Sequence, residues 1–431
     1  MAKLKIPYET AEETGVFLDL DVPDKNFLIQ CIPQERDPIR DLGKAAEDAV
    51  ESPVDGPKFS ELIQGGKKIT FMTENQFRAA PARDILPGLV EEAKQAGCDM
   101  SIIIGCGKVP PLTPEEIDEK LGADLAKSEI PIFCNDVSKP EDYRYVGVTT
   151  AGTPVFIHRA VADAEVKVSI STTQATLWGY GGSGMIIPAV AGNETIETNH
   201  IMALAPDCIP GNNDCRIQLD KYEALELCKV SMGINLIVDN KSQVIYVNAG
   251  SPVESHKEAV RHYNEIYEFS APQLNLRKAD IAITGSSAPT NHLFFHTGWA
   301  VVNCDPVVRD GGIIIQTTPC PGYGDWPGFA LMDLMKPYLP ASTENTVKAF
   351  RDFYNRETEL WAACIWFKIY EVMTRKEVWL VTEKGNIPFC KEIGLTTFES
   401  VEEAFAQAMK KCGDDAQVAF IPYGRYTVIK P

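Results

Sequence analysis

The sequence predicts an α/β protein made of two α/β domains with largely parallel sheets and a cleft between them. Segments with the pattern of strands alternate with segments with the pattern of helices along nearly all of the 431 residues. The alternation restarts near residue 270, after the Pro-containing connection SAPQLNLRK. We therefore expect a first domain over residues 1–270 and a second domain over residues 271–415.

An early βαβ unit is the clearest part of this pattern. Strands are predicted over residues 68–72 and 100–104, and a helix with apolar residues at helical spacing lies between them. Ligands of open α/β sheets bind beyond the carboxyl ends of the strands. The loops that follow the two strands, 75–78 and 106–109, are therefore expected to meet at one site.

The remaining elements follow from the same periodicities and from local capping signals. Asp37-Pro38 is expected to open a helix, and Ser400 with Glu403 three residues later has the pattern of a capping box. Further strands are predicted over residues 27–32, 280–284, 312–316 and 378–382. Further helices are predicted over residues 252–267 and 291–303.

Composition and charge argue against several classes of protein. The formal net charge of −19 disfavours a sequence-independent nucleic-acid binder, which needs a basic surface. No apolar run reaches the roughly 20 residues that span a bilayer, and the start of the chain lacks the pattern of a leader, so a cytoplasmic protein without a membrane partner is expected. The 12 cysteines are scattered singly and are expected to be reduced, most of them buried.

A glycine-rich loop follows the apolar, strand-like segment 165–171. Four glycines fall within six residues, at Gly179, Gly181, Gly182 and Gly184. Glycine lets the backbone adopt positive φ and bring N–H groups close to an anion. The spacing GYGGSG matches neither the dinucleotide-binding fingerprint nor a P-loop. It predicts either an anion-binding loop or a tight, closely packed turn.

The landmarks around this loop resemble the central signature of the nickel-dependent lactate racemase family. The chain reads GYGGSGM from residue 179, then PAVAG from residue 188, then Asn199-His200. Members of that family carry a Gly-Phe/Tyr-Ser-Gly-Gly-x-Lys loop, a Pro-Gly-hydrophobic motif and Asn-His in this order. The segments FRAAPARD from residue 77 and GSSAPTNH from residue 285 resemble further motifs of the family. The resemblance covers most of the chain and implies that residues 416–431 return to the first domain.

Several positions depart from the family pattern. Val109 stands where the first catalytic histidine is expected, and Gln174 with Ala175 stands where the second is expected. Met185 replaces the lysine to which many members attach their nickel-pincer nucleotide, and Trp299 replaces another lysine. The resemblance therefore implies that this cofactor, if used, is held noncovalently, in a pocket that is less positive and more apolar than is usual in the family.

The resemblance also implies a site for the nickel-pincer nucleotide itself. In the family this cofactor accepts hydride from the substrate carbon while a general base takes the hydroxyl proton. His200 occupies the nickel-ligand position, and imidazole suits nickel; a surface or capping histidine is the alternative. The cofactor-binding residues implied by the matched motifs are Asn75, Gly179, Tyr180, Gly181, Gly182 and Ser183.

Candidate substrate-binding and catalytic residues come from the same segments. Arg78 offers a guanidinium fork to a carboxylate or phosphate, or forms a salt bridge with Asp84 instead. Lys108 follows a predicted strand end and acts as a base if burial lowers its pKa, or is an ordinary solvated lysine. His296 stands at a substrate-contacting position and is a candidate for a relocated general base. The residues expected to contact the substrate beside Arg78 are Gln174 and Trp299.

The expected function is that of a racemase or epimerase acting at the hydroxyl-bearing carbon of a 2-hydroxy acid or sugar acid. Because both histidine positions are altered, lactate itself is not the expected substrate. The alternative is a relative that does not racemise and that binds a small anionic ligand, or catalyses another reaction, in the same cleft without nickel. In both hypotheses the partner of the protein is a small anionic molecule.

Overall fold

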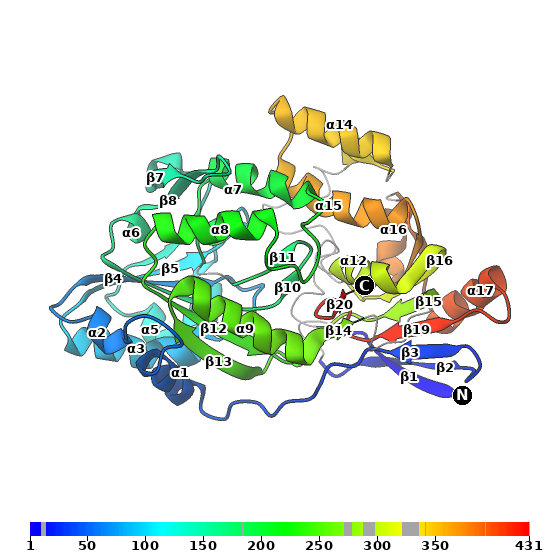
Figure 1. Cartoon of the computed structure of the whole chain (residues 1–431), viewed down its shortest axis with the longest axis horizontal. Helices are drawn as coiled ribbons and strands as arrows, with labels where there is room; N and C mark the ends of the chain where they lie inside the picture. The colour runs from blue at the N-terminus through cyan, green and yellow to red at the C-terminus, as the bar shows by residue number, and fades with distance from the viewer. Residues whose placement is uncertain are drawn as a thin grey trace.

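In the part of the chain that the computed structural model describes, two six-stranded sheets are packed among helices (Figure 1). The described residues are 1–9, 14–182, 185–270, 278–287, 298–320, 336–340, 342–392 and 394–430. The first sheet lies on the left of Figure 1 and the second on the right. The α/β fold class predicted from the alternation of elements is confirmed.

The first sheet has the strand order β13-β12-β9-β4-β5-β6. Its strands are β4 (Lys68–Glu74), β5 (Asp99–Gly105), β6 (Ile132–Cys134), β9 (Val166–Thr172), β12 (Met232–Val238) and β13 (Val244–Gly250). All neighbours pair in parallel except β12 and β13, which are antiparallel. The helix α3 (Ala82–Gln95) joins β4 to the parallel strand β5, so the predicted βαβ unit is confirmed.

Both faces of the first sheet are buried, as expected for a sheet of parallel strands. Alternate residues of β5 enter two different cores, because successive side chains of a strand point to opposite faces. Ile102 and Ile104 join the core that contains α1 (Leu42–Glu51) and α3, whereas Ile103 joins the core that contains residues 185–196.

The helix α1 begins later than the sequence suggested. It was expected to open at Asp37-Pro38, but the side chain of Asp41 is the N-cap and accepts a hydrogen bond from the backbone N–H of Lys44 at 3.0 Å. The N–H of Ile39 instead donates to the carbonyl of Val244, at the start of β13, at 2.8 Å. A hydrogen bond to a distant strand therefore keeps residues near Ile39 out of the helix that the local sequence predicted.

The second sheet is parallel throughout and has the order β18-β17-β16-β15-β19-β3. Its strands are β3 (Phe27–Gln30), β15 (Ala279–Thr284), β16 (Val308–Thr317), β17 (Glu377–Val381), β18 (Thr396–Phe398) and β19 (Val418–Ile421). Ile281 and Ile283 of β15 face a core shared with α17 (Val401–Cys412), and Ala282 faces the opposite core. The predicted strands in this half of the chain are all present within a few residues of their expected ends.

The two ends of the chain cross the expected domain boundary. The hairpin of β1 (Ala2–Pro7) and β2 (Phe17–Val22) packs into the core of the second sheet, and β3 forms the edge of that sheet. Near the other end, β19 also joins the second sheet, and β20 (Val428–Lys430) pairs with β14 (Glu268–Ser270) beyond the last helix of the first unit. We propose that the boundary stays near residue 270 and that residues 2–30 belong with the second unit.

The other elements complete the two units. The remaining helices are α2 (Phe59–Leu62), α4 (Pro114–Leu121), α5 (Ala123–Ala126), α6 (Arg159–Ala162), α7 (Asn193–His200), α8 (Arg216–Leu227), α9 (Pro252–Tyr267), α12 (Trp299–Cys304), α14 (Thr343–Tyr354), α15 (Leu360–Met373) and α16 (Ile387–Glu392). The remaining strands are β7 (Tyr143–Val148), β8 (Pro154–His158), β10 (Ala175–Thr176) and β11 (Gly179–Tyr180). The bounds of α9 are those predicted, and the Ser400 side chain caps α17 as expected. Residues 291–297 of the helix predicted over 291–303 lie outside the described residues.

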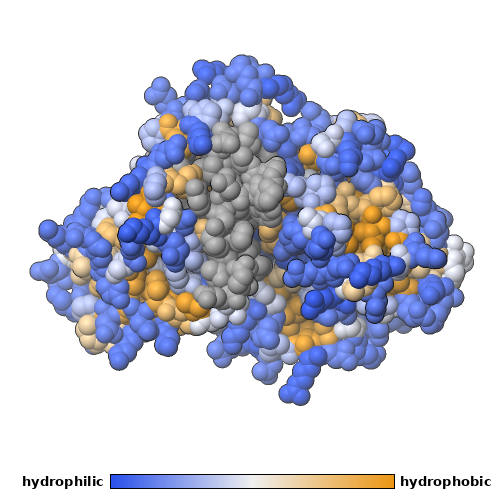
Figure 2. All heavy atoms as spheres, turned by 180° about the vertical axis from the view of Figure 1, so that it is seen from behind, coloured by the Kyte–Doolittle hydropathy of each residue, from blue (hydrophilic) through white to orange (hydrophobic). Residues whose placement is uncertain are grey.

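The face of the molecule in Figure 2 carries mainly hydrophilic side chains among its described residues, with apolar ones showing between them. No helix within the described ranges is long and apolar enough to cross a membrane. All 12 cysteines are free, and nine of them are buried. The expectation of reduced and largely buried cysteines agrees with this arrangement.

Candidate functional site

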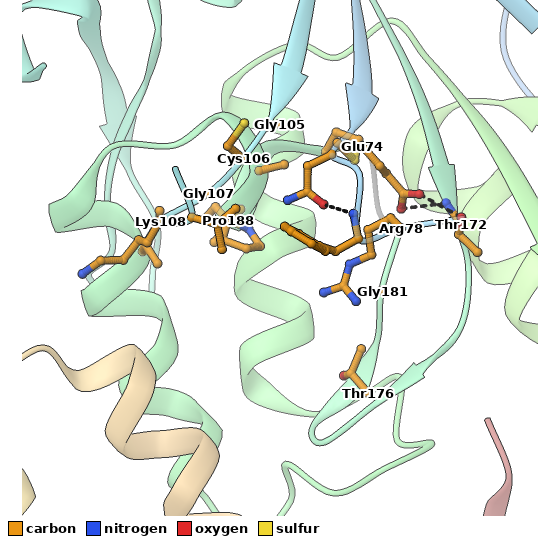
Figure 3. A pocket seen from close by; sticks show the side chains of 18 of the residues that line it. Glu74, Arg78, Gly105, Cys106, Gly107, Lys108, Thr172, Thr176, Gly181 and Pro188 are labelled. Atoms are coloured by element: carbon orange, nitrogen blue, oxygen red, sulfur yellow. Dashed lines mark hydrogen bonds between the residues drawn. The ribbon is translucent and has the colours of Figure 1, made fainter. Parts of the chain in front are cut away.

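One cavity of about 190 Å³ lies at the carboxyl-end edge of the first sheet (Figure 3). The loops after β4, β5 and β9 form one side of it, because parallel strands deliver these loops to the same edge. The glycine-rich loop, residues 185–189, α7 and α8 contribute further lining residues. Trp299 is the described lining residue that comes from the second unit, so the cavity lies where the two units meet.

The loop after β4 is held in place by buried polar groups. Glu74 accepts hydrogen bonds from the backbone N–H of Thr172 at 2.9 Å, from the Thr172 hydroxyl at 2.8 Å and from the N–H of Ala80 at 3.3 Å. Asn75 Oδ1 accepts from the N–H of Phe77 at 3.1 Å, which closes a tight turn. Glu74 thus ties the loop that carries Arg78 to the neighbouring strand β9, as the dashed lines in Figure 3 show for Thr172.

Lys120, on α4, supports the same loop from its other side. Its amine donates to the carbonyl of Ala80 at 2.7 Å and to that of Arg78 at 3.3 Å. Burial lowers the pKa of this lysine to about 8. Sequence reasoning assigned no role to Glu74 or Lys120, because their partners are backbone groups that come together only in the fold.

We expect the Glu74→Ala protein to be less stable than the wild type by at least about 2 kcal/mol. The substitution leaves two buried backbone N–H groups and one hydroxyl without their acceptor, and each unsatisfied group is costly. Urea unfolding followed by circular dichroism measures the loss, with the exposed Glu91→Ala as the matched control. Equal stability of the two variants would contradict the holding role of Glu74.

Arg78 extends from this loop into the cavity, and Figure 3 shows its guanidinium directed toward the side where Thr176 lies. Its Nη1 is buried and has no hydrogen-bond partner among the described residues, and no ion pair with Asp84 forms. Burial lowers the pKa of the guanidinium, which the charge of Glu74 partly offsets. A buried cation with an unsatisfied donor is a natural site for an anionic group of a ligand.

Trp299 links Arg78 to a second buried arginine. The guanidinium of Arg78 lies 5.7 Å from the centre of the Trp299 ring, and that of Arg425 lies 3.9 Å from it. Burial and the nearby charge of Arg78 lower the pKa of Arg425 to about 9. Trp299 therefore stands at the cavity as a flat apolar wall backed by positive charge.

The glycine-rich loop contributes only part of its residues to the cavity. Gly181 and Gly182 line it, whereas Gly179 and Tyr180 do not. Tyr180 is fully buried in a core with Tyr263, and its hydroxyl donates to Asn264 at 2.5 Å. Tyr180 therefore anchors the loop from behind and does not present its side chain to a cofactor. Ser183, also expected to bind the cofactor, lies outside the described residues.

The backbone N–H of Gly181 is not available to an anion, although the glycine-rich loop was one candidate for anion binding. Its N–H donates to the carbonyl of Gln174 at 2.8 Å, and its own carbonyl is 2.8 Å from Nε2 of His256. Because a carbonyl only accepts, Nε2 of His256 carries the proton, and Nδ1 accepts from the Tyr222 hydroxyl at 2.8 Å. His256 is fully buried and its pKa is lowered to about 4, so it holds the loop as a neutral imidazole.

His200 is buried at the end of α7 and lines the cavity. Its Nδ1 is 2.9 Å from the carbonyl of Ile196, so Nδ1 carries the proton and Nε2 keeps its lone pair. Burial, aided by the charge of Lys221, lowers the pKa of His200 to about 3. The ring packs edge-on against Trp178, with centroids 5.6 Å apart. His200 is thus a fixed neutral imidazole and not the surface histidine of the alternative interpretation.

Lys108 lines the cavity, but its amine is committed elsewhere. It forms ion pairs with the buried Glu197 of α7 and with Glu359, 3.2 Å away, the residue immediately before α15. Figure 3 shows its side chain directed away from Arg78. Lys108 therefore connects the first unit to α15 of the second unit, and it is not the solvated lysine of the alternative interpretation.

Both positions of the missing histidines reach the cavity, the second through only one of its two residues. Gln174 and Val109 line the cavity, whereas Ala175 is buried in a core with Val260 and does not reach it. Met185, at the position of the family's lysine, is also a lining residue. His296, the proposed relocated base, lies outside the described residues.

One lining residue, Lys221, was missed altogether. It lies on α8, is only 6% exposed and faces the same cavity as Arg78 and His200. Lys221 follows Asp220 and stands near Glu223, and a lysine among charged residues has the pattern of a solvated one, so nothing in the sequence indicated this position.

Comparisons with known proteins match both halves of the chain. Residues 15–208 match the family described as "Lactate racemase N-terminal domain", and residues 274–429 match "Lactate racemase C-terminal domain". A protein from Thermoanaerobacterium thermosaccharolyticum named "Lactate racemase" is 23% identical over 452 residues, with 100% of each chain covered. The two family matches together therefore cover most of the sequence.

Solved structures show the same fold. The lactate racemase apoprotein from Thermoanaerobacterium thermosaccharolyticum superposes with a TM-score of 0.88 at 20% identity, covering 100% of both chains. A Thermotoga maritima protein superposes with a TM-score of 0.67 at 16% identity, covering 92% of this chain and 100% of its own. With both domains matched in order and the fold shared, the chain belongs to the lactate racemase family.

Proposed function

We propose that the protein is a racemase or epimerase acting at the hydroxyl-bearing carbon of a 2-hydroxy acid or sugar acid. The family supports an isomerase, and the matched curated relative is named for lactate. The observation that carries the proposal is that one cavity is lined both by His200, a neutral imidazole whose Nε2 keeps its lone pair, and by Arg78, a guanidinium with an unsatisfied buried donor.

The site has features that fit a nickel-pincer nucleotide. His200 offers Nε2 to a metal while its Nδ1–H is fixed by a backbone carbonyl, which is how proteins orient imidazole ligands. Asn75, Gly181 and Gly182 would contact the nucleotide, and Met185 offers no amine for attachment, so the group would be held noncovalently. When bound, such a group supplies a hydride acceptor for the substrate carbon.

The residues of the chain would position the substrate. Arg78 would bind the substrate carboxylate through its unsatisfied donors. Gln174 would hydrogen-bond the hydroxyl group, but an amide does not take its proton. We retain His296 as the proposed general base. Lys108, also proposed as a base, would first have to leave Glu197 and Glu359.

The cavity favours a substrate other than lactate. Trp299 and Met185 place an aromatic and an aliphatic side chain where the resemblance implies lysines, so the lining is more apolar. We propose a 2-hydroxy acid with a bulkier chain than lactate, or a sugar acid, as the substrate class.

A second candidate is a nickel-free relative that binds a small anion without racemising it. The observation that favours it is the lack of a histidine at both Val109 and Gln174, the cavity-facing positions where opposed bases are expected. Nickel content separates the two candidates directly, because only the first requires the metal.

The test is a single preparation of the full chain, co-expressed with the enzymes that make the pincer nucleotide. We expect close to one nickel per chain by elemental analysis, and an intact mass under denaturing conditions equal to that of the bare polypeptide. The preparation is then incubated with a panel of 2-hydroxy and sugar acids in D₂O, and enantiomers or epimers are separated by chromatography. Hydride transfer should interconvert the isomers without placing deuterium at the reacting carbon. A protein that contains no nickel and binds the acids without converting them would support the second candidate.

A further inference from the structure

The strongest unexplained feature of the cavity is the buried amine of Lys221. The helix α8 is buried on several sides, and Lys221 lies on the side that lines the cavity. Its amine makes no hydrogen bond or ion pair with any residue that the structure describes. The adjacent Asp220 is not its partner, because Asp220 accepts from Asn199 at 2.7 Å, from Thr153 at 2.9 Å and from the hydroxyl of Thr149.

The acidic groups at the cavity are committed to other partners. Glu74 accepts three hydrogen bonds from Thr172 and Ala80, and Glu197 is paired with Lys108. Neither forms an ion pair with Arg78 or Lys221 within the described chain. Burying a cation without a directly bonded anion is costly, so two such cations in one cavity favour binding of an anion that comes from outside the chain.

Two thiols lie near Lys221 but do not replace that anion. Cys208 and Cys215 are fully buried, and a hydrogen bond from Cys208 lowers the pKa of Cys215 to about 7. Neither sulfur accepts a hydrogen bond from Lys221 within the described residues. Measurements at pH 6.5, below this pKa, keep Cys215 mainly protonated and so reduce the contribution of its charge.

We propose that Lys221 and Arg78 together form a two-cation subsite that binds one anionic oxygen group of the ligand. Guanidinium supplies a fixed fork of donors and the ammonium group a point charge, a combination suited to carboxylate and to phosphate. The group comes either from the substrate, as a carboxylate, or from a nucleotide, as a phosphate. The proposal rests on the proposed function for the identity of the ligand, but anion binding itself needs neither nickel nor turnover.

The experiment measures anion binding to the full chain purified without the pincer nucleotide, by calorimetry at pH 6.5. The probes are lactate, gluconate and inorganic phosphate, and the variants are Lys221→Met, Lys221→Arg and the exposed control Lys241→Met. We expect at least one probe to bind the wild type, and Lys221→Met to weaken that binding at least about tenfold, as for other hydrogen bonds to charged groups. Lys221→Arg should retain part of the affinity and Lys241→Met all of it.

The pattern across probes identifies the source of the anion. Binding of lactate or gluconate in preference to phosphate assigns the subsite to the substrate carboxylate, and the reverse preference assigns it to a nucleotide phosphate. No binding of any probe to the wild type, or unchanged binding to Lys221→Met, would overturn the proposal. Loss of nickel or of turnover in the separate loaded preparation would count against the proposed function and leave these binding results intact.

Unfolding of the ligand-free proteins separates a binding role from a structural one. Methionine has nearly the length of the lysine stem and removes an uncompensated buried charge, so Lys221→Met should unfold at the same temperature as the wild type or higher. A clearly lower unfolding temperature would mean that Lys221 holds the fold, and the subsite would be rejected. A mononucleotide adduct mapped to Lys221 by mass spectrometry would equally reject it, because the amine would then be an attachment point.

Discussion

We expect the His200→Ala protein to lose its bound nickel. In the structure Nε2 of His200 is the lone-pair atom of a neutral imidazole at the cavity, and its pKa of about 3 means that protons do not compete with a metal near neutral pH. Residues that only orient a metal ligand are worth about 10–100-fold in affinity, so loss of the ligand itself should weaken nickel retention by more than about 100-fold. Elemental analysis of protein co-expressed with the cofactor enzymes measures this.

The control for this substitution is His262→Ala. His262 lies on α9 beside Glu258 and Glu265, is partly exposed and does not line the cavity, so its removal should leave the nickel content unchanged. Circular dichroism must show that His200→Ala is folded, since the substitution also empties a buried site. A folded His200→Ala protein with wild-type nickel content would show that His200 is not the metal ligand.

The parts of the fold that could be predicted are those that local sequence determines. The bounds of α9 follow from Pro252 at its first turn and a regular apolar stripe, and both lie within one element. The predicted start of α1 was wrong because the backbone N–H of Ile39 donates to the carbonyl of Val244, some two hundred residues away. The joining of β3 and β19 in one sheet depends on pairing between the two ends of the chain, which no periodicity reports.

The candidate site likewise has residues whose position could be predicted from local sequence and residues whose position depends on the tertiary fold. The position of Arg78 at the cavity could be predicted, because the carboxyl ends of parallel strands always share one edge. Lys108 was correctly placed at a strand end, but its partners Glu197 and Glu359 come from two distant helices. Lys221 could not be predicted, since only the tertiary fold distinguishes a buried lysine on a helix from a solvated one.

We expect the cofactor-loaded wild-type protein to racemise lactate at least about 10⁴-fold more slowly than a relative that carries both catalytic histidines. Each proton-transfer group typically contributes about 10²–10⁴-fold, and Val109 and Gln174 supply no base at either cavity-facing position. Exchange between lactate enantiomers, followed by chiral chromatography, gives the rate.

The structure shows how the missing bases can be restored with a matched control. Val109→His combined with Gln174→His places an imidazole at both cavity-facing positions and should raise lactate racemisation by at least about 100-fold over either single variant, because interconversion needs a base on each side of the reacting carbon. Val109→His combined with Ala175→His should not, since Ala175 points into the core with Val260, and an imidazole there should also lower the unfolding temperature. Fast lactate turnover by the wild type, or equal gains from the two double variants, would mean that the proton-transfer residues lie elsewhere.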